Sequence, residues 1–230
     1  MNKYNIEQIK ERLLPLSTTI VSDALDAIGI TNNAVAGIRP VWNCPAIVGV
    51  ARTLRSLPAG PRVQQNHGSI VAAQQCKPGD IIVIGNGGDI ENNSWGEVVT
   101  WAAKMKGAVG CICDGAVRDV DVIEQIAFPV YAKGITPRTG RGRMVLDSVN
   151  SNVRFVNTQV SPGDIVFADV NGIVFIPPEL IDEVLEKAEE IQCREKAMIE
   201  KICKGANAIK VGLEGGYEDM LRESIPKNKI

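Results

Sequence analysis

The sequence has few of the side chains that bind soft metals. It contains a single histidine, His67, and its six cysteines form no CxxC pair. Zinc sites are built from several such ligands at short spacings, so we expect no Cys/His zinc centre. We interpret the cysteines as reduced, small apolar residues. A metal ion would therefore be held by oxygen ligands, which favours Mg²⁺ or Mn²⁺.

An excess of charge of one sign and long apolar runs are also missing. The 25 Lys and Arg residues nearly balance the 27 Asp and Glu residues, which gives a net charge of −2. The chain has no basic block of the kind that nucleic-acid-binding proteins carry. No apolar run approaches the roughly 20 residues of a membrane span, and residues 1–12 lack the apolar core of a signal peptide. We expect a cytoplasmic protein with neither a nucleic-acid nor a membrane partner.

Hydrophobic periodicity divides the 230 residues into predicted helices and strands. The pattern predicts helices at residues 5–14, 18–28, 68–75, 95–106, 120–126 and 179–204. It predicts strands at 47–54, 81–84, 108–113, 129–132, 165–168 and 172–176, short alternating strands within 144–160, and irregular segments at 30–46 and 56–66. Strands alternate with helices in the middle, and the end is rich in strands with a closing helix. This order predicts a mixed, layered α/β fold, and neither a TIM barrel nor a simple doubly wound sheet.

A glycine-rich segment, residues 85–89, follows a predicted strand and precedes the helix that begins near Trp95. The N–H groups of such a loop, and of a helix N-terminus, suit a small anion. The segment matches neither the GxGxxG fingerprint nor a Walker loop, so a carboxylate ligand is favoured over a nucleotide. The alternative interpretation is an ordinary turn.

Arg118 and Asp119 lie in the loop that follows a buried strand, where α/β proteins tend to bind ligands. If both side chains point into a cleft, we expect them not to pair with each other. Asp119 is then available for a hard cation, and Arg118 for a substrate oxygen. Glu97 falls in the first turn of the preceding helix. The alternatives are separate surface salt bridges, and for Glu97 a favourable interaction with the helix dipole.

Several motifs together resemble one family, the class II pyruvate aldolases of the RraA-like superfamily, over about residues 13–205. Its best-known enzyme is 4-hydroxy-4-methyl-2-oxoglutarate (HMG) aldolase, which also acts on 4-carboxy-4-hydroxy-2-oxoadipate. The family's discriminating motif is an acidic residue, twenty intervening residues, and Arg-Asp, which Glu97, residues 98–117 and Arg118-Asp119 match. The other matching motifs are Pro78-Gly79-Asp80, Trp95-Gly96-Glu97, Asp114-Gly115-Ala116-Val117, Phe128-Pro129-Val130 and Pro162-Gly163-Asp164. Departures from the family pattern, in residues 55–66 and at Lys133, lie outside the predicted metal site.

The resemblance implies a layered αββα sandwich of the swivelling β/β/α type. The expected organisation is a single domain over residues 1–210 with a closing C-terminal helix, followed by a tail over residues 211–230. The implied activity is that of a divalent-metal-dependent lyase, which cleaves 4-hydroxy-2-oxo acids to pyruvate and decarboxylates oxaloacetate as a side reaction. The alternatives are a non-catalytic regulator of ribonuclease E, whose members lack the acidic position, and another metal-dependent oxo-acid lyase.

The resemblance also implies roles for individual residues. Asp119 would bind Mg²⁺ or Mn²⁺ directly, and Glu97 would hold it through water. Arg118 would contact the 2-oxo oxygen and stabilise the enolate. The backbone amides near Gly96, Glu97 and Val98 would bind the substrate carboxylate.

In this family a glutamate from the last helix of a neighbouring subunit completes the site through water. Glu195 is the candidate here, and Glu200 is the alternative. The resemblance therefore implies a homotrimer or homohexamer with active sites between subunits.

Overall fold

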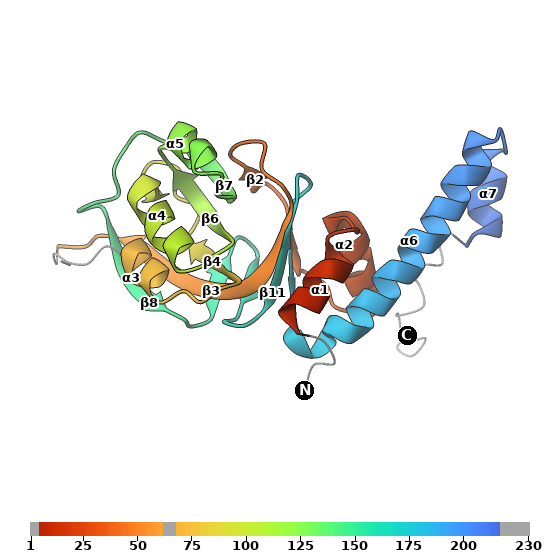
Figure 1. The fold of residues 1–230 in the computed structure, drawn as a ribbon, viewed down its shortest axis with the longest axis horizontal. Coiled ribbons are helices and arrows are strands. Elements are labelled where there is room, and N and C mark those ends of the chain that lie inside the picture. Colours follow the sequence, from red (N-terminus) through yellow and green to blue (C-terminus); the bar gives the residue numbers. More distant parts are fainter. Residues whose placement is uncertain (1–4, 62–67, 217–230) are drawn as a thin grey trace, which may run out of the picture.

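The computed structural model describes residues 5–61 and 68–216, which form one ten-stranded mixed sheet, a two-stranded sheet and the surrounding helices (Figure 1). The helices are α1 (Ile6–Leu13), α2 (Thr18–Ala27), α3 (Gly68–Gln74), α4 (Glu97–Met105), α5 (Val120–Gln125), α6 (Ile181–Cys203) and α7 (Ala208–Glu214), with a 3-10 turn at Pro178–Leu180. The strands are β1 (Ala34–Val35), β2 (Arg39–Pro40), β3 (Ile47–Pro58), β4 (Asp80–Gly85), β5 (Asn93–Trp95), β6 (Gly110–Val117), β7 (Val130–Ile135), β8 (Met144–Val149), β9 (Val153–Phe155), β10 (Thr158–Val160), β11 (Ile165–Ala168) and β12 (Ile173–Ile176). Within these ranges no helix is long and apolar enough to cross a membrane.

The alternation of side chains along the strands produces the layers. In β4, Ile82 and Ile84 belong to an apolar core with residues of α3, α4 and α5, whereas Ile81 and Val83 face a second core on the other side of the strand. That second core lies between strands, because Val166 of β11 also contributes to it.

The antiparallel part of the sheet repeats this alternation at the other end of the molecule. Phe167 of β11 and Val174 of β12 face a third core, which holds apolar residues of α1, α2 and α6. Their neighbours Val166 and Ile173 face the core between the strands. The layers therefore run helices, strands, strands, helices, which confirms the predicted αββα arrangement as a single domain with a C-terminal helix.

Most predicted elements are present, and most differences arise where strand pairing extends an element. Strand β3 continues to Pro58, because its second half pairs with β8, so the loop predicted at 56–66 begins too early. Strand β6 continues to Val117 through residues predicted as loop. The predicted domain boundary at residue 210 falls inside α7, while residues 62–67 and 217–230 lie outside the described part of the chain.

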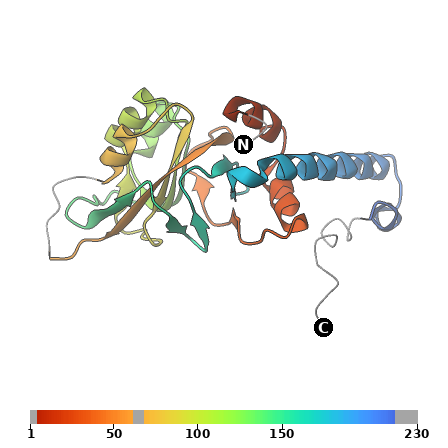
Figure 2. The ribbon, with the colours of Figure 1, turned by 90° about the horizontal axis from the view of Figure 1, so that it is seen from below.

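The C-terminal helix reaches well beyond the sheet. Figures 1 and 2 show the first turns of α6 packed beside α1 and α2, and its later turns extending away together with α7. The only buried residues in the core that α6 shares with α7 are Met198 and Val211, within the described ranges. The outer half of α6 is thus an arm with little packing against the rest of its own chain.

The start of α2 is fastened to the turn between β11 and β12 by Asp169. Its carboxylate accepts hydrogen bonds from the backbone N–H (2.9 Å) and the hydroxyl (2.7 Å) of Thr18, the first residue of α2, and from the backbone N–H of Asn171 (2.7 Å). Burial alone would raise the pKa of Asp169, but these hydrogen bonds hold the pKa below its ordinary value. The stability that the carboxylate contributes is therefore present above the ordinary aspartate pKa, and it is lost as the pH falls through the lower, folded-state pKa.

We expect Asp169→Asn to lower the free energy of unfolding at pH 7 by about 1–3 kcal/mol, because a charge-assisted set of hydrogen bonds is weakened. The variant should also lose less stability than the wild type between pH 5 and pH 3. Urea unfolding followed by circular dichroism measures both effects. Asp164→Asn is the control, because burial raises the pKa of Asp164. This substitution should change the acid dependence of stability in the opposite direction to Asp169→Asn. Equal acid sensitivity of the wild type and Asp169→Asn would contradict this account.

Candidate active site

Strand pairing brings the two predicted parts of the site together. Strands β5 and β6 are parallel, Trp95 pairs with Val117, and the N–H of Arg118 donates to the carbonyl of Trp95 at 3.0 Å. The chain leaves both strands at the same edge of the sheet, where parallel strands commonly present ligand-binding residues. Glu97 and the pair Arg118-Asp119 therefore emerge side by side, as the sequence predicted.

Asp119 adopts an unusual backbone conformation that directs its carboxylate toward α4. It stands at the N-cap position of α5 with φ = 58°, in the left-handed region, and its side chain makes no capping hydrogen bond to α5. Its Oδ2 instead accepts the backbone N–H of Glu97 at 3.0 Å. Left-handed residues other than glycine are costly, and they cluster at functional sites where the surrounding structure enforces them.

Gly96 makes this arrangement possible because it has no side chain. A Cβ at this position would lie 2.6 Å from Oδ2 of Asp119 and 3.2 Å from Cγ of Arg118. Any other residue would therefore displace the carboxylate or the arginine. The glycine of the predicted Trp95-Gly96-Glu97 motif thus has a steric role that the sequence did not specify.

The expectation that Arg118 and Asp119 would not pair is wrong. Nε of Arg118 lies 3.3 Å from Oδ2 of Asp119, because the left-handed turn at Asp119 folds its carboxylate back beside the arginine. The geometry is still not that of a hydrogen bond, and Nε is buried without an acceptor among the described residues. The side chain as a whole is 30% exposed, and its terminal nitrogens donate to no acceptor among the described residues, so they are available to a ligand oxygen.

These groups line a half-open cleft with an empty volume of about 370 Å³. Its walls also contain Val99 and Ile70, and, from the loop after β7, Thr139 and Arg141. Sequence analysis missed these two loop residues, because the only signal was the abundance of glycine and arginine in residues 134–143.

The glycine-rich loop does not line this cleft. The N–H of Gly88 donates to the carbonyl of Asp114 at 3.1 Å, and a Cβ at Gly88 would lie 2.7 Å from Nζ of Lys133. The loop thus packs on β6 beside a lysine of β7. The loop therefore contributes nothing to the cleft, and of the two N–H sources predicted for a small anion only the N-terminus of α4 reaches it.

The carboxylates of the cleft fit a hard cation. Within the described ranges, Oδ1 of Asp119 accepts no hydrogen bond, and neither does the half-buried carboxylate of Glu97. Oxygen-only donors suit Mg²⁺ or Mn²⁺, which commonly use one or two protein carboxylates and keep several waters. The same ranges contain no group of three or more His, Cys, Asp or Glu side chains that would hold a metal ion. Asp119 and Glu97 are therefore the candidate protein ligands in the cleft.

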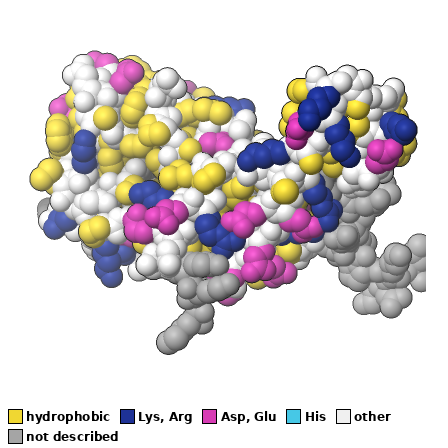
Figure 3. Space-filling view, turned by 45° about the vertical axis from the view of Figure 1, so that its right-hand side comes forward, with side chains coloured by type: hydrophobic (Ala, Val, Ile, Leu, Met, Phe, Trp, Pro, Cys, Tyr) yellow, Lys and Arg dark blue, Asp and Glu magenta, His cyan; other side chains and the backbone are white. Residues whose placement is uncertain are grey.

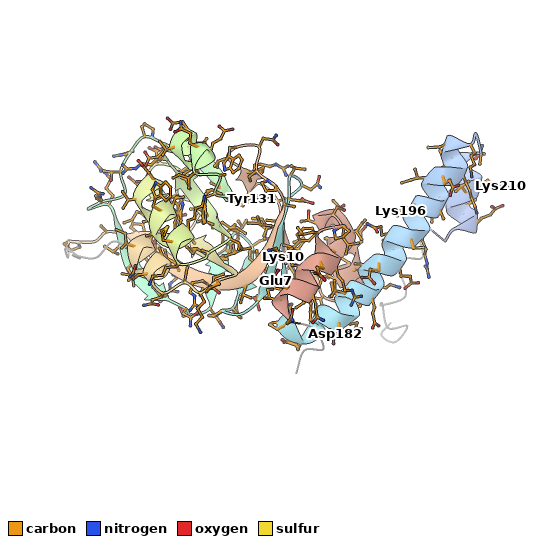
Figure 4. The ribbon with its side chains drawn as sticks, in the orientation of Figure 1. Glu7, Lys10, Tyr131, Asp182, Lys196 and Lys210 are labelled. Carbon is orange, nitrogen blue, oxygen red and sulfur yellow. The ribbon has the colours of Figure 1, made fainter. Side chains whose placement is uncertain are left out.

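The other predicted ligands lie far from the cleft of the same chain. Glu195 and Glu200 are on α6, whereas α4 and α5 stand at the opposite end of the molecule (Figure 1). Figure 4 labels Asp182 at the start of α6 and Lys196, the neighbour of Glu195, further out along it. Glu195 is half-buried, and it adds to the effect of burial in raising the pKa of Asp23. Glu200 is exposed and pairs with Lys204.

Comparisons with known proteins agree with this fold and identify a family. Residues 18–175 match the family model described as "RraA-like: Aldolase/RraA". A Halalkalibacterium halodurans protein named "Putative 4-hydroxy-4-methyl-2-oxoglutarate aldolase" is 31% identical over 93% of this chain and 97% of its own length. The Legionella pneumophila protein DlpA is 30% identical over 93% of this chain, and the chain spans 34% of DlpA.

Solved structures agree on the fold. A crystal structure of a Pseudomonas syringae protein superposes with a TM-score of 0.83 and 26% identity, over 93% of this chain and 97% of that one. Streptomyces coelicolor RraAS2, described as an unusual member of the RNase ES inhibitor RraA protein family, has a TM-score of 0.76 and 22% identity over 84% of this chain and 96% of its own.

We expect Gly96→Ala to weaken the binding of Mn²⁺ about tenfold or more, because the new methyl group displaces a carboxylate that must be held in place. The overpacking should lower the free energy of unfolding by only about 1–3 kcal/mol. Titration calorimetry with Mn²⁺ measures the affinity. The control is Gly60→Ala, in the exposed segment after β3, where a Cβ meets nothing within 4 Å. An unchanged Mn²⁺ affinity in Gly96→Ala would reject the steric role of this glycine.

Proposed function

The chain belongs to the RraA-like family, and from this premise we propose that it is a class II, divalent-metal-dependent aldolase. It would cleave 4-hydroxy-2-oxo acids such as HMG to pyruvate, and it would decarboxylate oxaloacetate as a side reaction. The observation that carries the proposal is the meeting of Glu97, Arg118 and Asp119 in one cleft, with Oδ2 of Asp119 fixed by the N–H of Glu97. The printed name of the Halalkalibacterium halodurans relative supports the same reaction.

Asp119 and Glu97 would hold Mg²⁺ or Mn²⁺, Asp119 directly and Glu97 through water. When bound, the ion acts as a Lewis acid toward the 2-oxo group of the substrate. The unused Oδ1 of Asp119 and the unused carboxylate of Glu97 are the protein atoms that this role requires.

Arg118 would stabilise the charge that develops during cleavage. Breaking the C3–C4 bond leaves the electron pair on the pyruvate fragment, where it forms an enolate oxygen. The guanidinium of Arg118 lines the cleft with 30% of its side chain exposed, so its terminal N–H groups would serve as donors for that oxygen. Loss of CO₂ from oxaloacetate leaves the same enolate, so the same donor would serve both reactions.

The first turn of α4 would hold the substrate's C1 carboxylate, because helix N-termini present N–H groups to anions. Of the three amides predicted for this role, that of Glu97 is already donated to Asp119, so it orients a catalytic side chain instead. The carboxylate of Glu97 would position a water that takes the proton from the C4 hydroxyl.

We further propose that the site is completed by a second copy of the chain in a homotrimer or homohexamer. Helix α4 exposes an apolar stripe beside the cleft, formed by Val98 (64% exposed), Trp101 (47%) and Met105 (78%). The arm formed by α6 and α7 exposes Ile199, Ile202, Ile209 and Leu213, and Figure 3 shows apolar side chains on the protruding part of the molecule. Two apolar surfaces at opposite ends of one chain suit a ring of copies, in which each arm covers the next α4.

Glu195 is the glutamate best placed for that role. It lines a half-open groove on the arm, with an empty volume of about 680 Å³, together with Met198, Ile199 and Ile202, so it would be carried to any partner that covers this apolar surface. Glu200 is already paired with Lys204, and it does not line the groove.

We expect Asp119→Asn to reduce pyruvate release from HMG and from oxaloacetate by more than about a hundredfold, since even loss of a group behind a metal ligand often costs 10- to 100-fold. A lactate dehydrogenase-coupled assay with Mg²⁺, and then with EDTA, measures the loss. Asp121→Asn, in the exposed first turn of α5, is the matched control. Undiminished turnover in Asp119→Asn would reject the site, and no turnover by the wild type would favour a non-catalytic regulator.

Mixing two inactive variants tests the shared site. Glu195→Gln and Asp119→Asn should each be nearly inactive. After equal mixing and subunit exchange, a site is active where an unchanged Asp119 meets an unchanged Glu195 of the next chain, which random pairing around a ring gives at about one site in four. The coupled assay follows the recovery, and Glu200→Gln is the control that should keep full activity on its own. No recovery by mixed subunits, with their exchange verified by native mass spectrometry, would contradict an active site shared between chains.

A further inference from the structure

One guanidinium in the cleft, that of Arg141, has no counterion among the residues that the structure describes. Arg141 lines the cleft, yet no described carboxylate or carbonyl lies within hydrogen-bonding or ion-pairing distance of its side chain. Every other arginine in the described ranges has such a partner: Asp80 for Arg52, Asp119 for Arg118, Glu91 for Arg138, and a backbone carbonyl for Arg143, for example. Arg141 is exposed, so an anion in the cleft can reach its guanidinium without displacing a protein partner, and a guanidinium matches a carboxylate in a bidentate pair.

The backbone of this loop is held firmly against β5. The side chain of Asn93, which is only 5% exposed, accepts the N–H of Gly140 at 2.7 Å, and the N–H of Asn93 donates to the carbonyl of Arg138 at 3.1 Å. A Cβ at Gly140 would lie 2.3 Å from the carbonyl oxygen of Asn93, so the two segments are in close contact. The hydroxyl of Thr139 accepts the N–H of Arg141 at 3.2 Å.

Asn93 therefore links the two ends of the cleft. Strand β5 leads directly from Asn93 to Gly96 and the N-terminus of α4, where the 2-oxo acid end of the substrate would bind. The same strand anchors the loop that carries Arg141. The backbone positions of Arg118 and Arg141 are thus set by the sheet and by the hydrogen bonds of Asn93.

We propose that Arg141 binds the distal carboxylate of the substrate and so selects 2-oxo acids with two carboxylates over those with one. This inference rests on the proposed function, because Asp119, Arg118 and α4 take the end that carries the C1 carboxylate and the 2-oxo group. A carboxylate at the other end matches a guanidinium in a bidentate, charge-assisted pair. A neutral end group would leave Arg141 hydrated and gain nothing from it.

The first test compares two substrates that share the reacting end. HMG carries a distal carboxylate, and 4-hydroxy-2-oxopentanoate does not. We expect Arg141→Gln to raise KM for HMG about tenfold or more with little change in kcat, as the loss of a charge-assisted hydrogen bond predicts. The kinetic constants for 4-hydroxy-2-oxopentanoate should stay unchanged, and Arg141→Lys should restore part of the affinity for HMG.

The matched control is Arg138→Gln on the same loop, because Arg138 pairs with Glu91 at the surface and does not line the cleft. It should behave as the wild type with both substrates, since exposed ion pairs contribute little. Equal effects of Arg141→Gln on both substrates, or no effect on either, would overturn the role of Arg141 while leaving the proposed function intact.

Binding of unreactive ligands separates the two proposals. Calorimetry with the Mn²⁺-loaded protein would compare 2-oxoglutarate, which has two carboxylates, with pyruvate, which has one. We expect Arg141→Gln to weaken 2-oxoglutarate binding about tenfold or more and to leave pyruvate binding unchanged. A wild type that releases no pyruvate but shows this difference would reject the aldolase and retain the subsite. Identical affinities in wild type and variant would reject the subsite.

Discussion

The register of β5 against β6 is the constraint on which the site depends. Because Trp95 pairs with Val117, the residues that follow each strand leave the sheet together, and the N–H of Glu97 reaches Oδ2 of Asp119. A shift of one residue in this pairing would turn the following side chains to the other face of the sheet and separate the two carboxylates. The proposed roles of these side chains, from holding the cation to stabilising the enolate oxygen, all require this one alignment.

The surrounding structure makes the alignment rigid. Every residue of β6 is buried, so the strand is fixed by apolar packing on both faces and by hydrogen bonds to β4, β5 and β7. The left-handed conformation of Asp119 costs of order 1 kcal/mol or more, and it persists because β6 and α5 hold the residue from both sides. A carboxylate held in place before the ligand arrives loses little conformational entropy on binding, which favours catalysis by position and charge.

The sequence predicted the parts of the molecule that follow from local patterns. Short apolar runs in β4 and β11 and the buried stripe of α6 predicted a layered α/β fold, and the strand-end rule placed Arg118 and Asp119 at a ligand-binding edge. The αββα order and the grouping of Glu97 with these two residues came from the resemblance to the family. Strand β5 escaped prediction because its three residues, two of them polar, carry no periodic signal. The left-handed turn at Asp119 and the position of Arg141 also escaped, since both depend on contacts between residues distant in sequence, such as Asn93 with Gly140.

The structure of the arm argues that the two ends of the cleft are completed in different ways. An isolated helix is marginal in water, and among the described residues the part of α6 beyond the core shared with α1 and α2 has buried apolar packing only with α7, around Met198. Its exposed isoleucines, like the stripe on α4, would gain stability from coverage, so the proposed second copy offers a reason for the arm as well as a source of Glu195. Arg141, by contrast, is anchored through Asn93 within its own chain. The reacting end of the cleft would then respond to assembly, whereas the end that distinguishes substrates would be set by one chain alone.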